Sequence, residues 1–257
     1  MMFPLAGRRI VITRASHQYS DLAHLLCREG AEPLPYPAIS IAPPEDTRPL
    51  DAALSEAASG GYDWLIFTSA NTATIVASRL RALGLRDGIK LSVAAVGQGT
   101  TLALARALRI RPSFVPHEAD ALSLAETLPL RPGARVLLPQ SEAADDRLKA
   151  ALIARGAEVT LISAYRVIQG EGGIDLPRLL PQVDAITFTS GSTVDHFVRR
   201  FTAEGGDLAA LGRVHLAYMG ASARYALAAH SLPPVIGARQ PTLEALVQAL
   251  KDTFHAG

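Results

Sequence analysis

Cysteine, lysine and aromatic residues are scarce in this sequence of 257 residues. It holds one cysteine, three lysines and 5% aromatic residues. The single cysteine, Cys27, excludes an intrachain disulfide framework and a multi-cysteine zinc site, and its helical context predicts a buried position. The 25 basic and 24 acidic residues leave a net charge of +1, so the basic excess of a general nucleic-acid binder is absent.

Long apolar stretches are missing as well. No window approaches 18 unbroken apolar residues, which predicts no transmembrane helix and no binding to a membrane. The first residues place charges at Arg8 and Arg9 before any apolar stretch of useful length, unlike a secretory signal. We therefore expect a cytoplasmic protein.

The motifs of common cofactor and metal sites do not occur. Gly97-Gln98-Gly99 begins like a dinucleotide fingerprint but lacks the third glycine. There is no Walker A sequence and no G-x-S-x-G nucleophile elbow. The seven histidines show no paired spacing typical of metal ligands. We expect neither a cofactor nor a metal.

Short apolar runs alternate with amphipathic stretches rich in alanine and leucine. This alternation predicts an α/β protein with parallel sheets and right-handed crossovers. The predicted strands are 9–13, 63–68, 91–96, 134–138, 158–162, 184–188 and 214–218. The predicted helices include 17–29, 71–83 and 100–108, with Gly84 ending the second.

An internal repeat indicates two homologous halves. The segment 62–69, which reads YDWLIFTS, matches 183–190, which reads VDAITFTS, with an offset of 121 residues. Two further matches occur in the same order, near Gly30 and Gly156 and near Gly97 and Gly220. A proline-rich stretch at 33–44 and a glycine-ended stretch at 163–173 are candidate crossings between domains. Two crossings make one domain discontinuous in sequence.

Polar residues follow several predicted strands, where open α/β sheets bind ligands. These residues are Thr13 and Arg14; Ser69, Ala70 and Asn71; Gly97; Ser190, Gly191 and Ser192; and Gly220. Serine and asparagine at such positions cap the next helix, and free helix N–H groups donate hydrogen bonds to anions. Plain capping without a ligand is the alternative, as is a surface ion pair for Arg14. Tyr165 lies in the second crossing, where packing at a domain joint is the simpler interpretation.

Taken together, these residues resemble the uroporphyrinogen-III synthase family over nearly the whole chain. The likeness rests on the order and spacing of weak motifs, because no single motif is diagnostic. The motifs are Thr13-Arg14, the run from Tyr62 to Asn71, the run from Ala95 to Thr100, Gly156 to Arg166, Phe188 to Ser192, and Gly220 to the helix after Pro241.

The resemblance implies two similar doubly wound α/β domains joined by a two-stranded connector, with a cleft between them. Domain 1 would hold residues 1–36 and 169–257, and domain 2 residues 37–168, with connector strands near 35–42 and 163–170. The implied enzyme closes the linear tetrapyrrole hydroxymethylbilane to uroporphyrinogen III, with loss of water and inversion of ring D, without a cofactor. A monomer in transient contact with hydroxymethylbilane synthase is expected.

The resemblance also implies roles for individual residues. Tyr165 matches the position of a tyrosine suspected of helping the hydroxyl leave, which favours catalysis over packing. The strand-end residues named above, together with Thr100 and Gln140, would bind the substrate. The chain departs from the family at two places: Pro139-Gln140-Ser141 replaces a frequent Arg-Gly, and Ala223 replaces a usual threonine. Both departures put contacts from those loops in doubt.

Two other functions compete with this interpretation. A two-lobed small-molecule binding or regulatory protein would share the repeated halves and the hinged cleft without catalysis. A nucleotide-dependent enzyme would use the turn at Gly97-Gln98-Gly99 and would be stabilised against heat by nucleotide.

Overall fold

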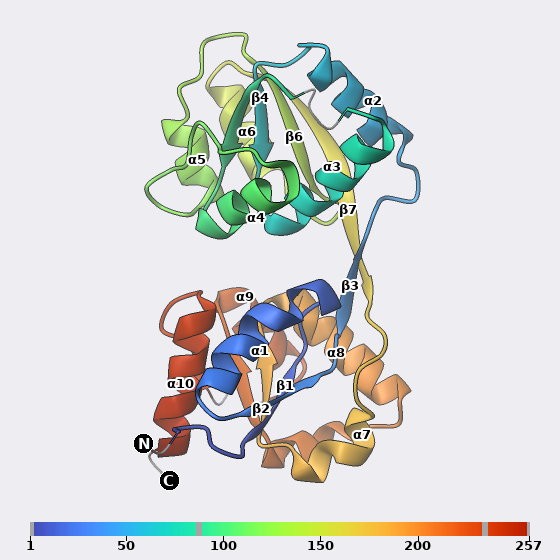
Figure 1. The fold of residues 1–257 in the computed structure, drawn as a ribbon, viewed down its shortest axis with the longest axis vertical. Helices are drawn as coiled ribbons and strands as arrows, with labels where there is room; N and C mark the ends of the chain where they lie inside the picture. Colours follow the sequence, from blue (N-terminus) through green and yellow to red (C-terminus); the bar gives the residue numbers. More distant parts are fainter. Residues whose placement is uncertain (1–2, 86–88, 233–235, 256–257) are drawn as a thin grey trace. The chain divides into compact units, whose positions relative to one another are not determined.

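The computed structural model describes residues 3–85, 89–232 and 236–255, which form two compact units. Unit 1 comprises Met1–Ser40 and Ile168–Gly257, and unit 2 comprises Ile41–Val167. Each unit contains a five-stranded sheet with helices beside it (Figure 1). The prediction of an α/β fold built on parallel sheets is confirmed.

The sheet of unit 1 has the strand order β10-β9-β8-β1-β2, and all neighbouring strands run parallel. Helices α1 and α10 pack on one face around Leu22 and Leu250, and α8 and α9 pack on the other around Phe197 and Leu227. The strands are β1 (Arg9–Ile12), β2 (Glu32–Pro35), β8 (Ala185–Phe188), β9 (His215–Tyr218) and β10 (Ile236–Gly237). The helices are α1 (Tyr19–Arg28), α7 (Leu176–Leu179), α8 (Gly191–Ala203), α9 (Ala221–Ala229) and α10 (Leu243–His255).

The sheet of unit 2 has the order β3-β7-β6-β4-β5, and the pairs β4–β5, β4–β6 and β6–β7 are parallel. Helices α2, α3 and α4 pack on one face, and α5 and α6 on the other. The strands are β3 (Ile39–Ala42), β4 (Trp64–Phe67), β5 (Ser92–Ala95), β6 (Arg135–Ser141) and β7 (Glu158–Gln169). The helices are α2 (Arg48–Ala58), α3 (Ala70–Ala82), α4 (Gln98–Leu108), α5 (Ala121–Thr127) and α6 (Arg147–Ala154).

The chain passes between the units twice. The proline-rich stretch holds two short strands rather than a plain linker: β2 lies at the edge of the first sheet and β3 at the edge of the second. Edge positions suit Pro33 and Pro35, because proline has no N–H to donate to a further strand. Strand β7 continues to Gln169, well past the predicted end at residue 162, and so runs through the second crossing.

Cys27 corrects an expectation from the sequence. It is exposed, whereas we expected burial. Helix α1 buries Leu22, Ala23 and Leu26, and Cys27 lies outside that face. Within the described residues, no helix has the length and apolar character needed to cross a membrane.

Strands β1 and β8 are tied together by buried threonines. The Thr13 hydroxyl donates to the Thr187 carbonyl at 2.6 Å, and the Thr187 hydroxyl donates to the Val11 carbonyl at 2.8 Å. Both side chains are fully buried. The two bonds join the two strands from which the chain continues in opposite directions across the sheet, from β1 to β2 and from β8 to β9.

Replacing Thr187 by valine is expected to lower the free energy of unfolding by about 1–3 kcal/mol. The shape is nearly unchanged, but the Val11 carbonyl loses the hydroxyl that donates to it inside the protein. Urea unfolding followed by circular dichroism measures the change. The control is Thr74→Val at an exposed position of α3, where the hydroxyl donates to the Ala70 carbonyl and the expected loss is below about 0.5 kcal/mol. Equal losses for the two variants would contradict the prediction.

Candidate functional site

Unit 1 has its candidate site where the carboxyl ends of β1 and β8 meet. The chain leaves β1 toward one face of the sheet and β8 toward the other, and open α/β sheets bind ligands at such a reversal point. Thr13 and Arg14 follow β1, and Ser190 follows β8. The structure therefore brings these predicted residues to one edge of one sheet.

Ser190 is the N-cap of α8. Its Oγ accepts from the Thr193 N–H at 3.3 Å, and the Thr193 hydroxyl accepts from the Ser190 N–H at 3.1 Å, which makes a reciprocal capping box. Ser192 Oγ lies 3.0 Å from Ser190 Oγ. A side chain at Gly191 would approach the Ser222 carbonyl oxygen at 3.1 Å, so glycine permits the close packing of α8 and α9.

Arg14 carries an incompletely paired positive charge at this edge. Its Nη1 donates to the Gln18 carbonyl at 3.3 Å, and its buried Nε has no hydrogen-bond partner in the described part of the chain. Burial lowers the pKa of Arg14, and the nearby Asp21 carboxylate partly opposes that effect. The guanidinium stays charged at any working pH, so a bidentate anion would complete its bonding.

Unit 2 places a matching serine, Ser69, after β4. Ser69 is the N-cap of α3, with its Oγ accepting from the Thr72 N–H at 3.1 Å, and Ala70 and Asn71 begin the helix. The Tyr165 hydroxyl, on β7, lies 3.4 Å from Ser69 Oγ. The Tyr165 side chain is 8% exposed and packs in the apolar core of unit 2. A phenol with a buried ring and a hydroxyl at the strand-end edge is suited to proton donation.

Two further helices have a glycine at the N-cap, which has no side chain to bond the first N–H groups. Gly97 precedes α4 and Gly220 precedes α9, and neither N-cap supplies a side-chain hydrogen bond to the first turn. The first N–H groups of these helices are thus without a capping side chain, as an anion site requires. Thr100 is buried in the first turn of α4. Gly97 and Gly220 occupy equivalent places in the two units.

Gly220 has a φ of +80°, a conformation that costs an L-residue free energy. With a ψ of 163° this is a backbone region that only glycine adopts readily. Gly220→Ala is expected to destabilise unit 1 by about 1–3 kcal/mol, because no atom within 4 Å obstructs the new methyl group and only backbone strain remains. Thermal unfolding measures this. The control is Gly212→Ala, at a glycine with equally open space and no positive φ. A Gly220→Ala protein as stable as this control would refute the strain argument.

Gln140 lies at the end of β6 and lines a pocket of about 340 Å³ in unit 2. Its side chain is 5% exposed, and its Oε1 has no partner among the described residues. Thr68, Asp120 and Asp145 also line the pocket, and Asp120 and Asp145 were not among the residues predicted from the sequence. Asp120 had a detectable signal, since it caps α5 directly before an apolar run, with bonds from the Leu122 and Ser123 N–H groups.

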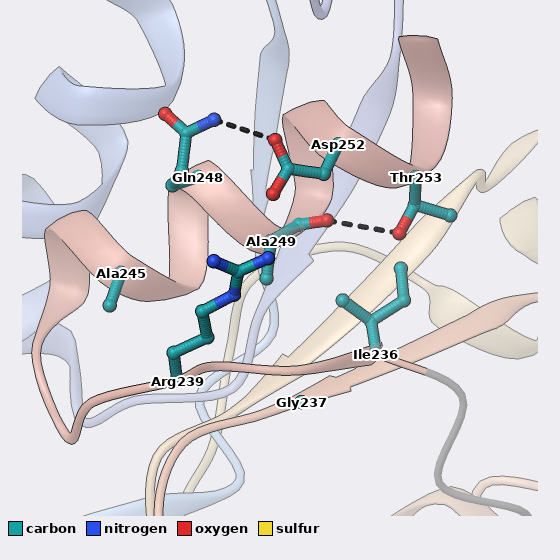
Figure 2. A pocket seen from close by; sticks show the side chains of 8 residues that line it. All are labelled: Ile236, Gly237, Arg239, Ala245, Gln248, Ala249, Asp252 and Thr253. Carbon is teal, nitrogen blue, oxygen red and sulfur yellow. Dashed lines mark hydrogen bonds between the residues drawn. The ribbon is translucent and has the colours of Figure 1, made fainter. Parts of the chain in front are cut away.

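A second pocket, of about 290 Å³, lies between β10 and α10 (Figure 2). Its lining includes Arg239 and Asp252 and none of the predicted site residues. Asp252 already accepts from Gln248 Nε2 at 2.7 Å, and Thr253 bonds within the helix. No group of three or more histidine, cysteine or acidic side chains arranged for a metal ion occurs in residues 3–85, 89–232 and 236–255.

Comparisons with known proteins place the chain near one enzyme family. The family model described as "Uroporphyrinogen-III synthase HemD" matches residues 20–248. A uroporphyrinogen-III synthase of Synechococcus elongatus is 36% identical over 203 residues, which cover 76% of this chain and 75% of the relative.

Solved structures agree in fold. A uroporphyrinogen III synthase from Thermus thermophilus aligns over 98% of this chain and 100% of its own, with a TM-score of 0.60 and 22% identity. The uroporphyrinogen-III synthetase of Helicobacter pylori aligns over 96% and 99%, with a TM-score of 0.60 and 17% identity. At these identities the two structures show the fold alone.

Proposed function

Because the chain belongs to the uroporphyrinogen-III synthase family, we propose that the strand-end residues of both units carry out that family's reaction. The reaction closes hydroxymethylbilane to uroporphyrinogen III in tetrapyrrole biosynthesis. The terminal hydroxyl leaves as water, and ring D is inverted before the macrocycle closes. The observation that carries the residue assignment is the equivalence of the two edges, where Ser69 and Ser190 cap matching helices and Gly97 and Gly220 leave matching helix ends uncapped.

Binding rests on the carboxylates of the substrate. Acetate and propionate groups accept hydrogen bonds from the N–H groups at the starts of α4 and α9 and from the guanidinium of Arg14. The hydroxyls of Ser69, Ser190 and Ser192 supply further polar contacts. Several fixed anchors hold a flexible chain in one folded geometry, which lowers the entropic barrier to the correct closure. Gln140 offers an amide where the family often has arginine.

Proton transfer rests on Tyr165. The Tyr165 hydroxyl donates a proton to the departing hydroxyl group, which leaves as water. The carbon left electron-deficient is attacked by the ring D carbon that already carries the bridge to ring C. The bridge bond to that carbon then breaks and re-forms at the free α-carbon of ring D, which inverts the ring. Ring closure then releases a proton, so the sum of the steps is the loss of one water. Ser69 Oγ, itself held by the Thr72 N–H, orients the phenol.

The protein acts, on this proposal, as a cytoplasmic monomer that receives its substrate through a transient contact with hydroxymethylbilane synthase. Rapid transfer has a chemical reason, because free hydroxymethylbilane closes unaided to the wrong isomer. Gel filtration with light scattering measures the molar mass in solution, and we expect the mass of one chain. A stable dimer at micromolar concentration would contradict it.

The decisive experiment is a coupled assay. Porphobilinogen and hydroxymethylbilane synthase are incubated with and without this protein, the products are oxidised, and porphyrin isomers I and III are separated. We expect the product to change from isomer I to isomer III. Isomer I alone, in the presence of correctly folded protein, would overturn the proposed function and favour a two-lobed binding protein.

A further inference from the structure

A buried arginine on α8 contacts both crossings of the chain. Arg200 Nη1 donates to the Pro37 carbonyl at 2.7 Å, and Nη2 donates to the Gly172 carbonyl at 2.8 Å. Pro37 belongs to the first crossing and Gly172 to the second. One guanidinium therefore bonds two chain segments that are far apart in sequence, and both bonds lie within unit 1.

The surroundings of Arg200 satisfy its charge. Its Nε donates to Glu204 Oε1 at 2.7 Å, and its guanidinium lies 3.9 Å from the centre of the Tyr36 ring. The Tyr36 hydroxyl donates to the other oxygen of Glu204 at 2.8 Å. The Arg200 side chain is 8% exposed and Tyr36 is fully buried. Burial, together with the bond to Glu204, raises the pKa of Tyr36, so the phenol remains a donor.

The two crossings are also packed closely against each other. The Gly170 N–H donates to the Ala38 carbonyl, and the Ile174 N–H donates to the Pro35 carbonyl, both at 2.9 Å. A side chain at Gly170 would come within 2.1 Å of the Pro37 carbonyl oxygen, and one at Gly173 within 2.2 Å of the Pro35 oxygen. Only glycine allows this approach.

The first crossing continues to the candidate site. The Tyr36 N–H donates to the Ile12 carbonyl at 3.0 Å, and the Ala38 N–H donates to the Thr13 carbonyl at 2.9 Å. The carbonyl that Arg200 holds, that of Pro37, lies between these two bonds. Residues 36–38 therefore fix the backbone of Thr13, directly before Arg14.

We propose that Arg200 is a positioning residue, which fixes both crossings on α8 and, through residues 36–38, holds the Thr13–Arg14 edge in its binding geometry. The role rests on the proposed function, in which Arg14 binds the substrate. The hydrogen bonds of Arg200 go to Glu204, Pro37 and Gly172, which are not among the residues proposed to bind the substrate. Lysine cannot replace it, because a single ammonium group cannot reproduce the planar, five-donor geometry of a guanidinium.

The test compares Arg200→Met with Arg79→Met by hydrogen exchange and by the coupled assay. Arg79 makes a two-bond ion pair with Asp51 of α2 inside unit 2, at 2.8 and 2.6 Å, so its bonds go to α2 and not to the crossings. In Arg200→Met we expect the amides of Ala38, Gly170 and Ile174 to exchange about tenfold faster or more, because bonds to a charged group are lost at that place. We also expect a higher KM and a smaller share of isomer III. In Arg79→Met those amides and the isomer share keep the parent values.

Three outcomes overturn the proposal. They are unchanged protection of the three amides in folded Arg200→Met, faster exchange there without any change in KM or isomer share, and an equal loss of isomer share in Arg79→Met. If Arg200→Met does not fold, Arg200→Lys carries the same expectations. Failure of the proposed function is distinguishable, because then the parent protein itself forms no isomer III, whereas hydrogen exchange reports on Arg200 regardless of activity.

Discussion

Replacing Tyr165 by phenylalanine is expected to lower the rate of uroporphyrinogen III formation by about 100-fold or more, the contribution typical of a positioned general acid. The ring and its packing in the core of unit 2 remain. Among the described residues, the substitution removes the hydrogen bond between the Tyr165 hydroxyl and Ser69 Oγ, which are 3.4 Å apart, so the variant is expected to fold normally. The coupled assay under single-turnover conditions gives the rate, and the slower reaction leaves more substrate to close unaided to isomer I.

Tyr62→Phe is the matched control for this variant. Tyr62 is also buried in unit 2, and its hydroxyl donates to Glu56 at 3.1 Å, away from the strand ends. We expect Tyr62→Phe to keep nearly the full rate. Full activity in Tyr165→Phe would remove the hydroxyl from the mechanism and leave Tyr165 as a packing residue.

Arg14→Gln is expected to raise KM about tenfold to 100-fold with a smaller effect on kcat. A hydrogen bond to a charged group contributes about 1.5–3 kcal/mol to binding. A loss of about 1.4 kcal/mol lowers the affinity about tenfold. Arg14 has unused donor capacity in the described chain, so a carboxylate can take it without breaking a strong internal bond. Initial rates against substrate concentration separate KM from kcat.

Arg8→Gln tests whether the effect belongs to position 14. Arg8 precedes β1 at the opposite edge of the same sheet and pairs with Asp184 at 2.8 Å. This variant removes the same charge from the same unit, so the net charge of the protein falls equally. We expect KM close to the parent value. Equal increases in KM for the two variants would assign the effect to net charge instead of to a contact of Arg14.

Helix starts were predictable because their signals are local. Ser69 and Ser190 cap α3 and α8 as their positions before apolar helical patterns suggest, and Gly84, just past the end of α3, adopts the positive φ that such a position favours. Buried strands such as Trp64–Phe67 were evident as short apolar runs between turn signals. Each of these features depends on a few neighbouring residues.

Contacts between distant residues were not predictable in the same way. The pair formed by Tyr165 and Ser69 joins residues 96 positions apart, and the bond from Arg200 to Pro37 spans 163 positions. No local pattern distinguishes these residues, since Arg200 is one of two adjacent arginines on α8. The burial of Cys27 was predicted wrongly because periodicity alone did not locate the edge of the buried face of α1.

The sequence by itself determined the α/β class, the two related halves and the polar residues that follow the strands, because propensity, apolar period and capping are properties of short segments. Only the tertiary structure decided the order of the strands, and hence which strand ends are neighbours. It also decided that Arg200 joins the two crossings and that Arg14 Nε has no partner among the described residues. These features depend on which distant segments pack together to bury apolar surface and satisfy backbone hydrogen bonds, and short segments do not encode that choice.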